Sequence, residues 1–163
     1  MKEKTVTPFK KNMGFSLIEL LVVLAIMTIL IGGAGVGISL ASSRDAQKSA
    51  KTIDNALAMS RLCAMSREGD FMLEIDLQNH KLEVMGEGEE ALPGKVDISV
   101  QGISSVNVLQ IKFDKSTGKV SQILTDGAAY ADGVLKITSE NPNGKVATVV
   151  LVTNTGKHFV EYK

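Results

Sequence analysis

A charge-free stretch constrains this chain more than any other feature of its 163 residues. From Leu20 to Leu40 no Asp, Glu, Lys or Arg occurs, and the first charge after Glu19 is Arg44. Because a helix rises about 1.5 Å per residue, this stretch would measure about 31 Å, close to the roughly 30 Å hydrocarbon thickness of a bilayer. The stretch therefore predicts a transmembrane helix.

The residues before this stretch predict its orientation. Four lysines lie within residues 1–11, and basic residues that flank a membrane segment stay on the cytoplasmic side. We therefore expect a single pass through the cytoplasmic membrane, with the N-terminus in the cytoplasm and the C-terminal domain outside.

Three interpretations of the stretch compete. A secretory signal peptide is favoured by the small residues Ser39 and Ala41, which suit a signal peptidase, but the apolar run exceeds the usual length of roughly 7 to 15 residues. A plain anchor explains length and orientation but not Glu19, because a carboxylate costs up to about 3 kcal/mol at a helix centre and less near its end. The third interpretation is a specialised leader followed by a packing helix.

The residues just before the stretch favour the third interpretation. They read Lys10-Lys11-Asn12-Met13-Gly14-Phe15-Ser16-Leu17-Ile18-Glu19, a segment that resembles the junction of a type IV prepilin. In that family a prepilin peptidase removes a basic leader that ends in Gly, the new N-terminal residue, usually Phe, is N-methylated, and Glu stands fifth in the mature chain. The resemblance implies cleavage between Gly14 and Phe15, methylation of Phe15, and a role for Glu19 in assembly.

The resemblance also implies partners and a destination. These are the prepilin peptidase, other pilins or pseudopilins, an inner-membrane assembly platform with its ATPase, and the lipid bilayer before assembly. Glu19 would neutralise the amine of Phe15 on a neighbouring subunit and so set the axial register, because a buried ion requires a partner. Alternatively, Glu19 is an interfacial residue that reaches the lipid headgroups. The assembled filament would be periplasmic or extracellular.

Four glycines weaken the apolar stretch. Gly32, Gly33, Gly35 and Gly37 fall within six residues, and each costs a helix about 1 kcal/mol relative to Ala. They either let the helix bend or unwind, or let neighbouring helices approach closely, as the spacing of Gly33 and Gly37 allows. Pilins commonly carry a Pro near this place, where this chain has Val36.

The rest of the chain predicts an α+β domain. Apolar residues recur with a helical period over residues 44–67, which indicates an amphipathic helix. From residue 70 the period changes to two, and Phe71, Leu73, Ile75 and Leu77 mark one face of a strand. Further strands are expected at residues 81–85, 96–100, 106–113, 120–124, 134–138, 146–152 and 158–162, joined by Gly-containing turns that favour antiparallel pairing.

The expected organisation is therefore a leader at residues 1–14, a transmembrane and assembly helix at 15–43, and an extracytoplasmic pilin-like domain at 44–163. In this domain the amphipathic helix packs on antiparallel sheets. The segments Leu57–Ala64, Phe113–Gly118 and Val152–Gly156 together look like the GspH/FimT-type minor pilins and pseudopilins. This second resemblance rests on common strand and turn residues.

Catalytic or metal chemistry has little support. The single cysteine, Cys63, lies near the apolar stripe of the helix and is expected to be a small buried side chain. His80 and His158 have no second ligand at a recognisable spacing and are expected at the surface. The run Glu87, Glu89 and Glu90 is expected in a solvated loop. We therefore expect no enzyme, no cofactor and no metal.

The predicted function is that of a structural subunit, a minor pilin or pseudopilin of a type IV pilus or a type II secretion-like filament. The alternative is a filament-tip subunit that binds DNA or another ligand in uptake or adhesion. Removing residues 1–14 takes away four lysines and one glutamate, which leaves 14 basic and 17 acidic residues and a net charge of −3. DNA binding is therefore possible but not favoured. A third possibility is an uncut, anchored or secreted domain that forms no filament.

Overall fold

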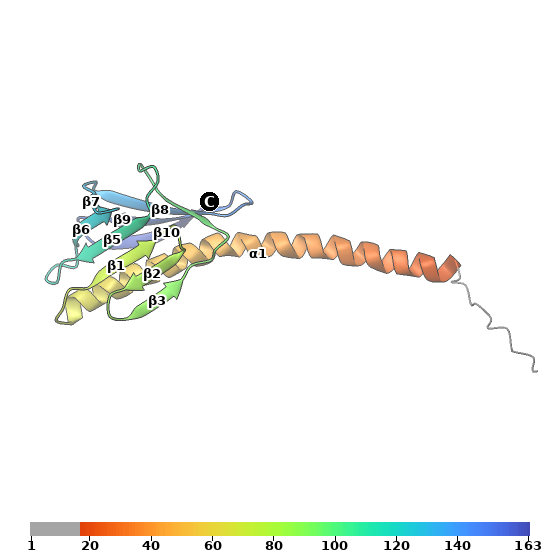
Figure 1. Cartoon of the computed structure of the whole chain (residues 1–163), viewed down its shortest axis with the longest axis horizontal. Helices are drawn as coiled ribbons and strands as arrows, with labels where there is room; N and C mark the ends of the chain where they lie inside the picture. The colour runs from red at the N-terminus through yellow and green to blue at the C-terminus, as the bar shows by residue number, and fades with distance from the viewer. Residues whose placement is uncertain (1–16) are drawn as a thin grey trace, which may run out of the picture. The chain divides into compact units, whose positions relative to one another are not determined.

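The structure, a computed structural model, describes residues 17–163, with side chains for residues 17–30 and 44–163. The chain divides into two units, Met1–Ile38 and Ser39–Lys163. A helix of 50 residues, α1 (Leu17–Ser66), begins in the first unit and ends in the second, and strands follow it (Figure 1). The described residues therefore form an α+β structure, consistent with a pilin-like fold.

The strands of the second unit form two antiparallel sheets. The six-stranded sheet has the order β3-β2-β1-β5-β6-β7, and the four-stranded sheet has the order β10-β9-β8-β4. The strands are β1 (Met72–Asp76), β2 (Lys81–Val84), β3 (Gly88–Ala91), β4 (Asp97–Val100), β5 (Val108–Phe113), β6 (Val120–Thr125), β7 (Ala128–Ala129), β8 (Val134–Glu140), β9 (Val146–Val152) and β10 (Lys157–Tyr162).

The C-terminal part of α1 buries one stripe against these sheets. Ala46, Ala50, Ile53, Leu57 and Ala64 recur at helical spacing and are at most 2% exposed. The alanines on this stripe are small, so the helix can approach the strands closely. Over the stretch where the sequence predicts an amphipathic helix, residues 44–67, the structure is helical as far as Ser66.

One hydrophobic core joins the helix to both sheets. Leu73 and Ile111 enter it from the six-stranded sheet, and Ile137 and Val149 enter it from the four-stranded sheet. Every second residue of β5 and β8 is buried, as expected for a sheet with one face toward a core.

One prediction for this region is wrong. The run of glutamates expected in a solvated loop contains β3, which pairs with β2 and forms an edge of the six-stranded sheet. All four residues of β3 are exposed, so no alternation of apolar and polar residues could reveal the strand. Backbone hydrogen bonds to β2 hold β3 in place.

Candidate functional site

The first described part of α1 is apolar on all sides. Its large apolar side chains are between 45% and 82% exposed: Leu17, Ile18, Leu20, Leu21, Val22, Val23, Leu24, Ile26, Met27, Ile29 and Leu30. Fully burying one such side chain is worth about 1.5–3 kcal/mol. A helix with this surface is typical of one that lipid or neighbouring helices cover.

Glu19 lies in this surface and is the only acidic residue in the first turn of α1. Its side chain is exposed. A carboxylate at this position is favoured by the partial positive charge of the helix N-terminus. Gly14 and Phe15, where the sequence predicts cleavage and methylation, lie outside the described residues.

The glycine cluster lies within α1. Gly32, Gly33, Gly35 and Gly37 belong to residues 31–43, where the side-chain surroundings are outside the described part.

The expected transmembrane helix at residues 15–43 lies partly outside the described residues. Among the residues that are described, no helix combines the length and the apolar character that crossing a membrane requires. The transmembrane segment stays a prediction.

The fold brings together three segments that the sequence singled out for their pattern. Arg61, within the helical segment Leu57–Ala64, reaches the turns at the ends of the other two segments, Phe113–Gly118 and Val152–Gly156. Its Nη2 atom donates to the carbonyl oxygen of Thr155 at 3.4 Å. The three segments are therefore parts of one contact between α1 and both sheets.

Two glycines make this contact possible. Gly118 and Gly156 have φ angles of +64° and +67°, in the left-handed region that favours glycine. A Cβ atom on Gly118 would lie 2.6 Å from Sδ of Met65, and a Cβ atom on Gly156 would collide with the carbonyl oxygen of Gly118. The sequence indicated only that these glycines end turns, because the contact joins residues far apart in the chain.

Both histidines, expected at the surface, are half-buried and hydrogen-bonded. His80 Nε2 lies 2.7 Å from the carbonyl oxygen of Val96. His158 Nδ1 donates to Asp54 Oδ1 at 2.6 Å, which joins β10 to α1. The surface prediction was wrong because it considered neighbours in the sequence, whereas both partners come from other segments.

Asp54 also accepts a hydrogen bond from Lys51 Nζ at 2.9 Å. Burial raises the pKa of Asp54, but the hydrogen bonds from His158 and Lys51 outweigh burial and hold this pKa below its ordinary value. The carboxylate is therefore charged in the folded protein and ties two elements together.

Cys63 is 2% exposed, which confirms the expected buried side chain. Its Sγ atom lies 3.9 Å from Oε1 of Glu87, and Glu87 also forms an ion pair with Arg67. No group of three His, Cys, Asp or Glu side chains among the described residues could hold a metal ion.

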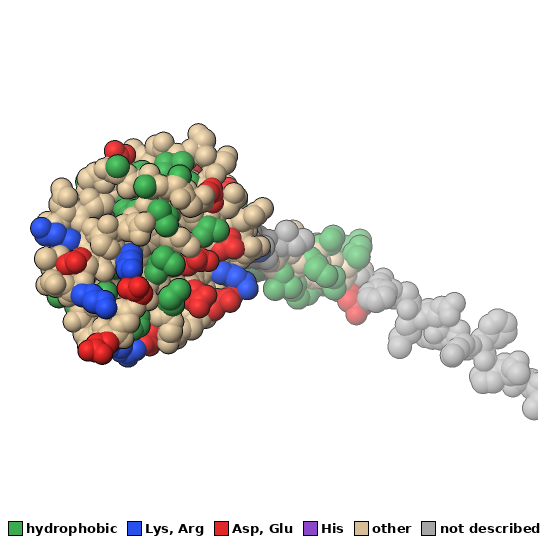
Figure 2. Space-filling model, turned by 60° about the vertical axis from the view of Figure 1, so that its left-hand side comes forward, with side chains coloured by type: hydrophobic (Ala, Val, Ile, Leu, Met, Phe, Trp, Pro, Cys, Tyr) green, Lys and Arg blue, Asp and Glu red, His purple; other side chains and the backbone are tan. Residues whose placement is uncertain are grey.

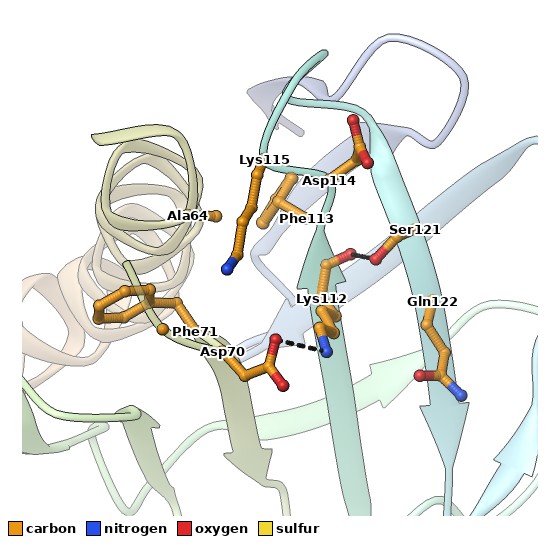
Figure 3. Close-up of a pocket in the computed structure, with 10 residues that line it drawn as sticks. Ala64, Asp70, Phe71, Lys112, Phe113, Asp114, Lys115, Ser121 and Gln122 are labelled. Carbon is orange, nitrogen blue, oxygen red and sulfur yellow. Dashed lines mark hydrogen bonds and ion pairs between the residues drawn. The ribbon is translucent and has the colours of Figure 1, made fainter. Parts of the chain in front are cut away.

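An open pocket of about 460 Å³ lies beside the C-terminal end of α1 (Figure 3). Asp70 and Lys112 form an ion pair of 3.0 Å across it, and the hydrogen bond from Lys112 lowers the pKa of Asp70. The side chain of Lys115 reaches down between α1 and β5. The hydroxyl of Ser121 donates to the carbonyl oxygen of Lys112, so it is not paired with a general base. This arrangement offers charge and shape but no activated nucleophile.

A comparison with protein families identifies the N-terminal segment. Residues 10–35 match the prokaryotic N-terminal methylation motif. The motif spans Gly14, Phe15 and Glu19 and continues through the apolar part of α1. It supports, in general, a type IV pilin-like or pseudopilin-like subunit that is processed at its N-terminus. No match was found among the curated proteins or among the solved structures.

Proposed function

We propose that this chain is a minor pilin or pseudopilin of a type IV pilus or a type II secretion-like filament. The prepilin peptidase cuts between Gly14 and Phe15, and Phe15 is N-methylated. The subunit waits in the cytoplasmic membrane with its C-terminal domain outside, and an assembly platform with its ATPase adds it to the filament.

One observation carries this proposal. The methylation motif at residues 10–35 coincides with a helix whose described side chains, from Leu17 to Leu30, are exposed and apolar apart from Glu19 and Thr28. A helix of this kind needs lipid or other helices around it. In a filament, the same helices of neighbouring subunits would cover it.

Glu19 has a specific role in this account. Cleavage creates a positively charged amine on Phe15, and packing the helices removes water from that amine. A carboxylate from the adjacent subunit offsets the cost of burying the charge, provided that the two groups meet. The pair Phe15 amine and Glu19 therefore fixes how far one subunit slides along the next.

The second unit supports the GspH/FimT-type assignment within this proposal. The three segments that suggested that type meet at Arg61, Gly118 and Gly156. A shared contact explains why the three patterns would occur together in one chain. The hydrophobic core of the second unit also supports the proposal, because a domain outside the membrane needs a core of its own to be stable.

DNA binding by a filament-tip subunit stays the alternative prediction. The face that Figure 2 shows carries basic and acidic side chains interspersed with each other. Binding to phosphates instead requires clustered Lys and Arg. The proposal therefore does not depend on a nucleic acid.

The substitution Glu19→Ala tests the assembly role. We expect the processed subunit to accumulate in the membrane and to fall at least tenfold in a sheared filament fraction, because an unpaired buried charge costs about 3–5 kcal/mol. Immunoblots of the two fractions measure the distribution.

Glu68→Ala is the matched control, since Glu68 is an exposed glutamate of the second unit. It should leave the distribution unchanged. If Glu19→Ala enters the filament fraction as well as Glu68→Ala does, the assembly role is wrong, and Glu19 is only a residue of the membrane interface.

A further inference from the structure

The six-stranded sheet ends in a strand with a free backbone edge. β3 pairs with β2 on one side, and no described strand lies on its other side (Figure 1). Leu92 donates its backbone N–H to the carbonyl oxygen of His80, one pair beyond the ladder of β2 and β3. Hydrogen-bonded and non-hydrogen-bonded pairs alternate along an antiparallel ladder. The N–H and C=O groups of Glu89 and Ala91 therefore point away from β2, where a further strand can bond to them.

A groove of about 450 Å³ lies between this edge strand and α1. Asn55 and Met59 line it from α1, and Leu82 and Val84 line it from β2. The side chain of Met59 is 37% exposed. The groove therefore offers apolar contacts directly beside a free strand edge.

The face of β3 toward this groove carries one residue without a side chain and one charged residue. Gly88 pairs in register with Val84, and Glu90 pairs with Leu82. Residues that pair across two strands share a face of the sheet, and both partners on β2 are buried toward the core. A Cβ atom on Gly88 would meet nothing within 4 Å. The groove therefore has open space over Gly88 and a carboxylate two residues further along.

The carboxylate of Glu90 is available to a partner. The other two glutamates of this segment are already in ion pairs, Glu87 with Arg67 and Glu89 with Lys81. Among the described residues, the exposed side chain of Glu90 has neither a hydrogen bond nor an ion pair. A cation on an incoming segment can pair with it.

We propose that β3 and this groove bind an extended segment of another protein, in which Lys or Arg stands two residues before a large apolar residue. The segment adds to β3 as an antiparallel strand, a recurring mode of peptide recognition. Its middle residue exchanges two backbone hydrogen bonds with Glu89. The residues on either side of the middle one lie opposite Glu90 and Gly88, in the pairs whose side chains approach most closely.

The order of the two side chains follows from the direction of the strands. In an antiparallel pair, the residue before the middle one lies opposite Glu90 and the residue after it lies opposite Gly88. A basic residue at the first position meets the carboxylate. An apolar residue at the second position fills the space over Gly88 and faces Met59. An aromatic side chain opposite an edge glycine is a known device for stabilising such a pair.

Charge disfavours a second β3 as the occupant. Two copies of β3 in an antiparallel pair would place the glutamates of one copy beside those of the other, and like charges across a strand pair are destabilising. The inference concerns a partner of the folded second unit and does not rest on the filament proposal.

Fluorescence anisotropy with two labelled peptides tests the site. The probe is Thr-Lys-Thr-Phe-Thr-amide and the control is Thr-Phe-Thr-Lys-Thr-amide, each with the same fluorophore at its N-terminus. The two have the same composition, so detergent micelles take them up equally. The full chain in detergent should bind the probe about fivefold more tightly than the control, because only the probe places Lys opposite Glu90 and Phe opposite Gly88.

Three variants test the groups involved. Glu90→Gln should weaken binding of the probe about three- to fivefold, as expected for the loss of a partly exposed ion pair. Glu83→Gln is the matched control, because Glu83 is exposed on the opposite face of the same sheet and should leave binding unchanged. Glu89→Pro removes an N–H of the free edge and should abolish binding, whereas the sheet tolerates a proline on an edge strand. A circular dichroism spectrum of each variant checks that the fold is unchanged.

The outcomes are distinct. A probe that binds more tightly than the control, and that is weakened by Glu90→Gln and Glu89→Pro but not by Glu83→Gln, establishes the site. Absence of binding, equal affinity of the two peptides, or a probe that ignores Glu90→Gln overturns it. Self-association of the unchanged chain that Glu90→Lys abolishes would show that a second copy occupies the edge, and would overturn the proposed partner.

Discussion

At Gly156 the fold leaves no room for a side chain. Its φ angle of +67° already disfavours other residues, and a Cβ atom would collide with the carbonyl oxygen of Gly118. Gly156→Ala should therefore lower the free energy of unfolding by about 3 kcal/mol or more, the sum of backbone strain and displaced packing. Urea unfolding of the full chain in detergent, followed by circular dichroism, measures the loss.

Gly144→Ala separates the collision from the backbone strain. Gly144 has a similar φ of +75°, but a Cβ atom there would meet nothing within 4 Å. This control should cost only about 1 kcal/mol. Equal losses at the two positions would show that the contact beneath Arg61 is not tight.

The carboxylate of Asp54 predicts a dependence of stability on pH. Its pKa is lowered in the folded protein by the hydrogen bonds from His158 and Lys51, so the unfolded chain binds a proton at higher pH than the folded protein does. The stabilisation is present above about pH 4 and is lost as the pH falls through the lowered folded pKa. Acid unfolding curves should show this loss.

Asp54→Asn removes the titrating group. The variant should be less stable at neutral pH by about 1–3 kcal/mol, because His158 loses a charged partner. It should also lose less stability than the unchanged chain when the pH falls from about 5 to about 3. Parallel acid dependence in both proteins would contradict the role of Asp54.

At the scale of elements, the sequence predicts those helices and strands in which apolar residues recur at a regular spacing. The helix over residues 44–67 shows apolar residues at helical spacing, and strands such as β1, β5 and β8 show alternation of apolar and polar residues. The structure places these elements within a few residues of the expected bounds. β3 was missed because all its residues are exposed. β7, with two exposed alanines, offered no pattern either.

The contacts between elements could not be predicted from the sequence. The hydrogen bonds of His158 with Asp54 and of Arg61 with Thr155 join residues 104 and 94 positions apart. No local pattern encodes such a pair, because it depends on how the sheets close around α1. The assembly helix expected at residues 15–43 is the opposite case, because the methylation motif, the apolar stretch and Glu19 are all local features of the sequence.

A buried hydroxyl pair provides a test of the packing of α1 on β8. Ser139 Oγ donates to Ser49 Oγ at 3.2 Å, and both residues are fully buried. Ser49→Ala should cost about 1–3 kcal/mol, since it leaves the hydroxyl of Ser139 without this partner. Thermal unfolding of the full chain measures this cost.

The double variant Ser49→Ala with Ser139→Ala completes the cycle. Removing both hydroxyls leaves neither unsatisfied, so the double variant should be no less stable than Ser49→Ala alone. Strictly additive losses would mean that the two hydroxyls do not interact.

At the scale of the whole molecule, the two units differ in what buries their apolar side chains. The second unit has its own core and two complete sheets. The first unit exposes apolar side chains from Leu17 to Leu30 and gains from burial only when lipid or other subunits supply it. We propose that the prepilin peptidase removes residues 1–14 before this helix packs against its neighbours in the filament.

Mass spectrometry of the mature N-terminus tests this central claim most directly. The protein is purified from cells with and without their prepilin peptidase. The account predicts a chain that begins with methylated Phe15 in the first cells and an uncut chain in the second. An intact Met1 in cells that have the peptidase, or a chain that begins at Ser42, would contradict the account and leave an ordinary anchored or secreted domain.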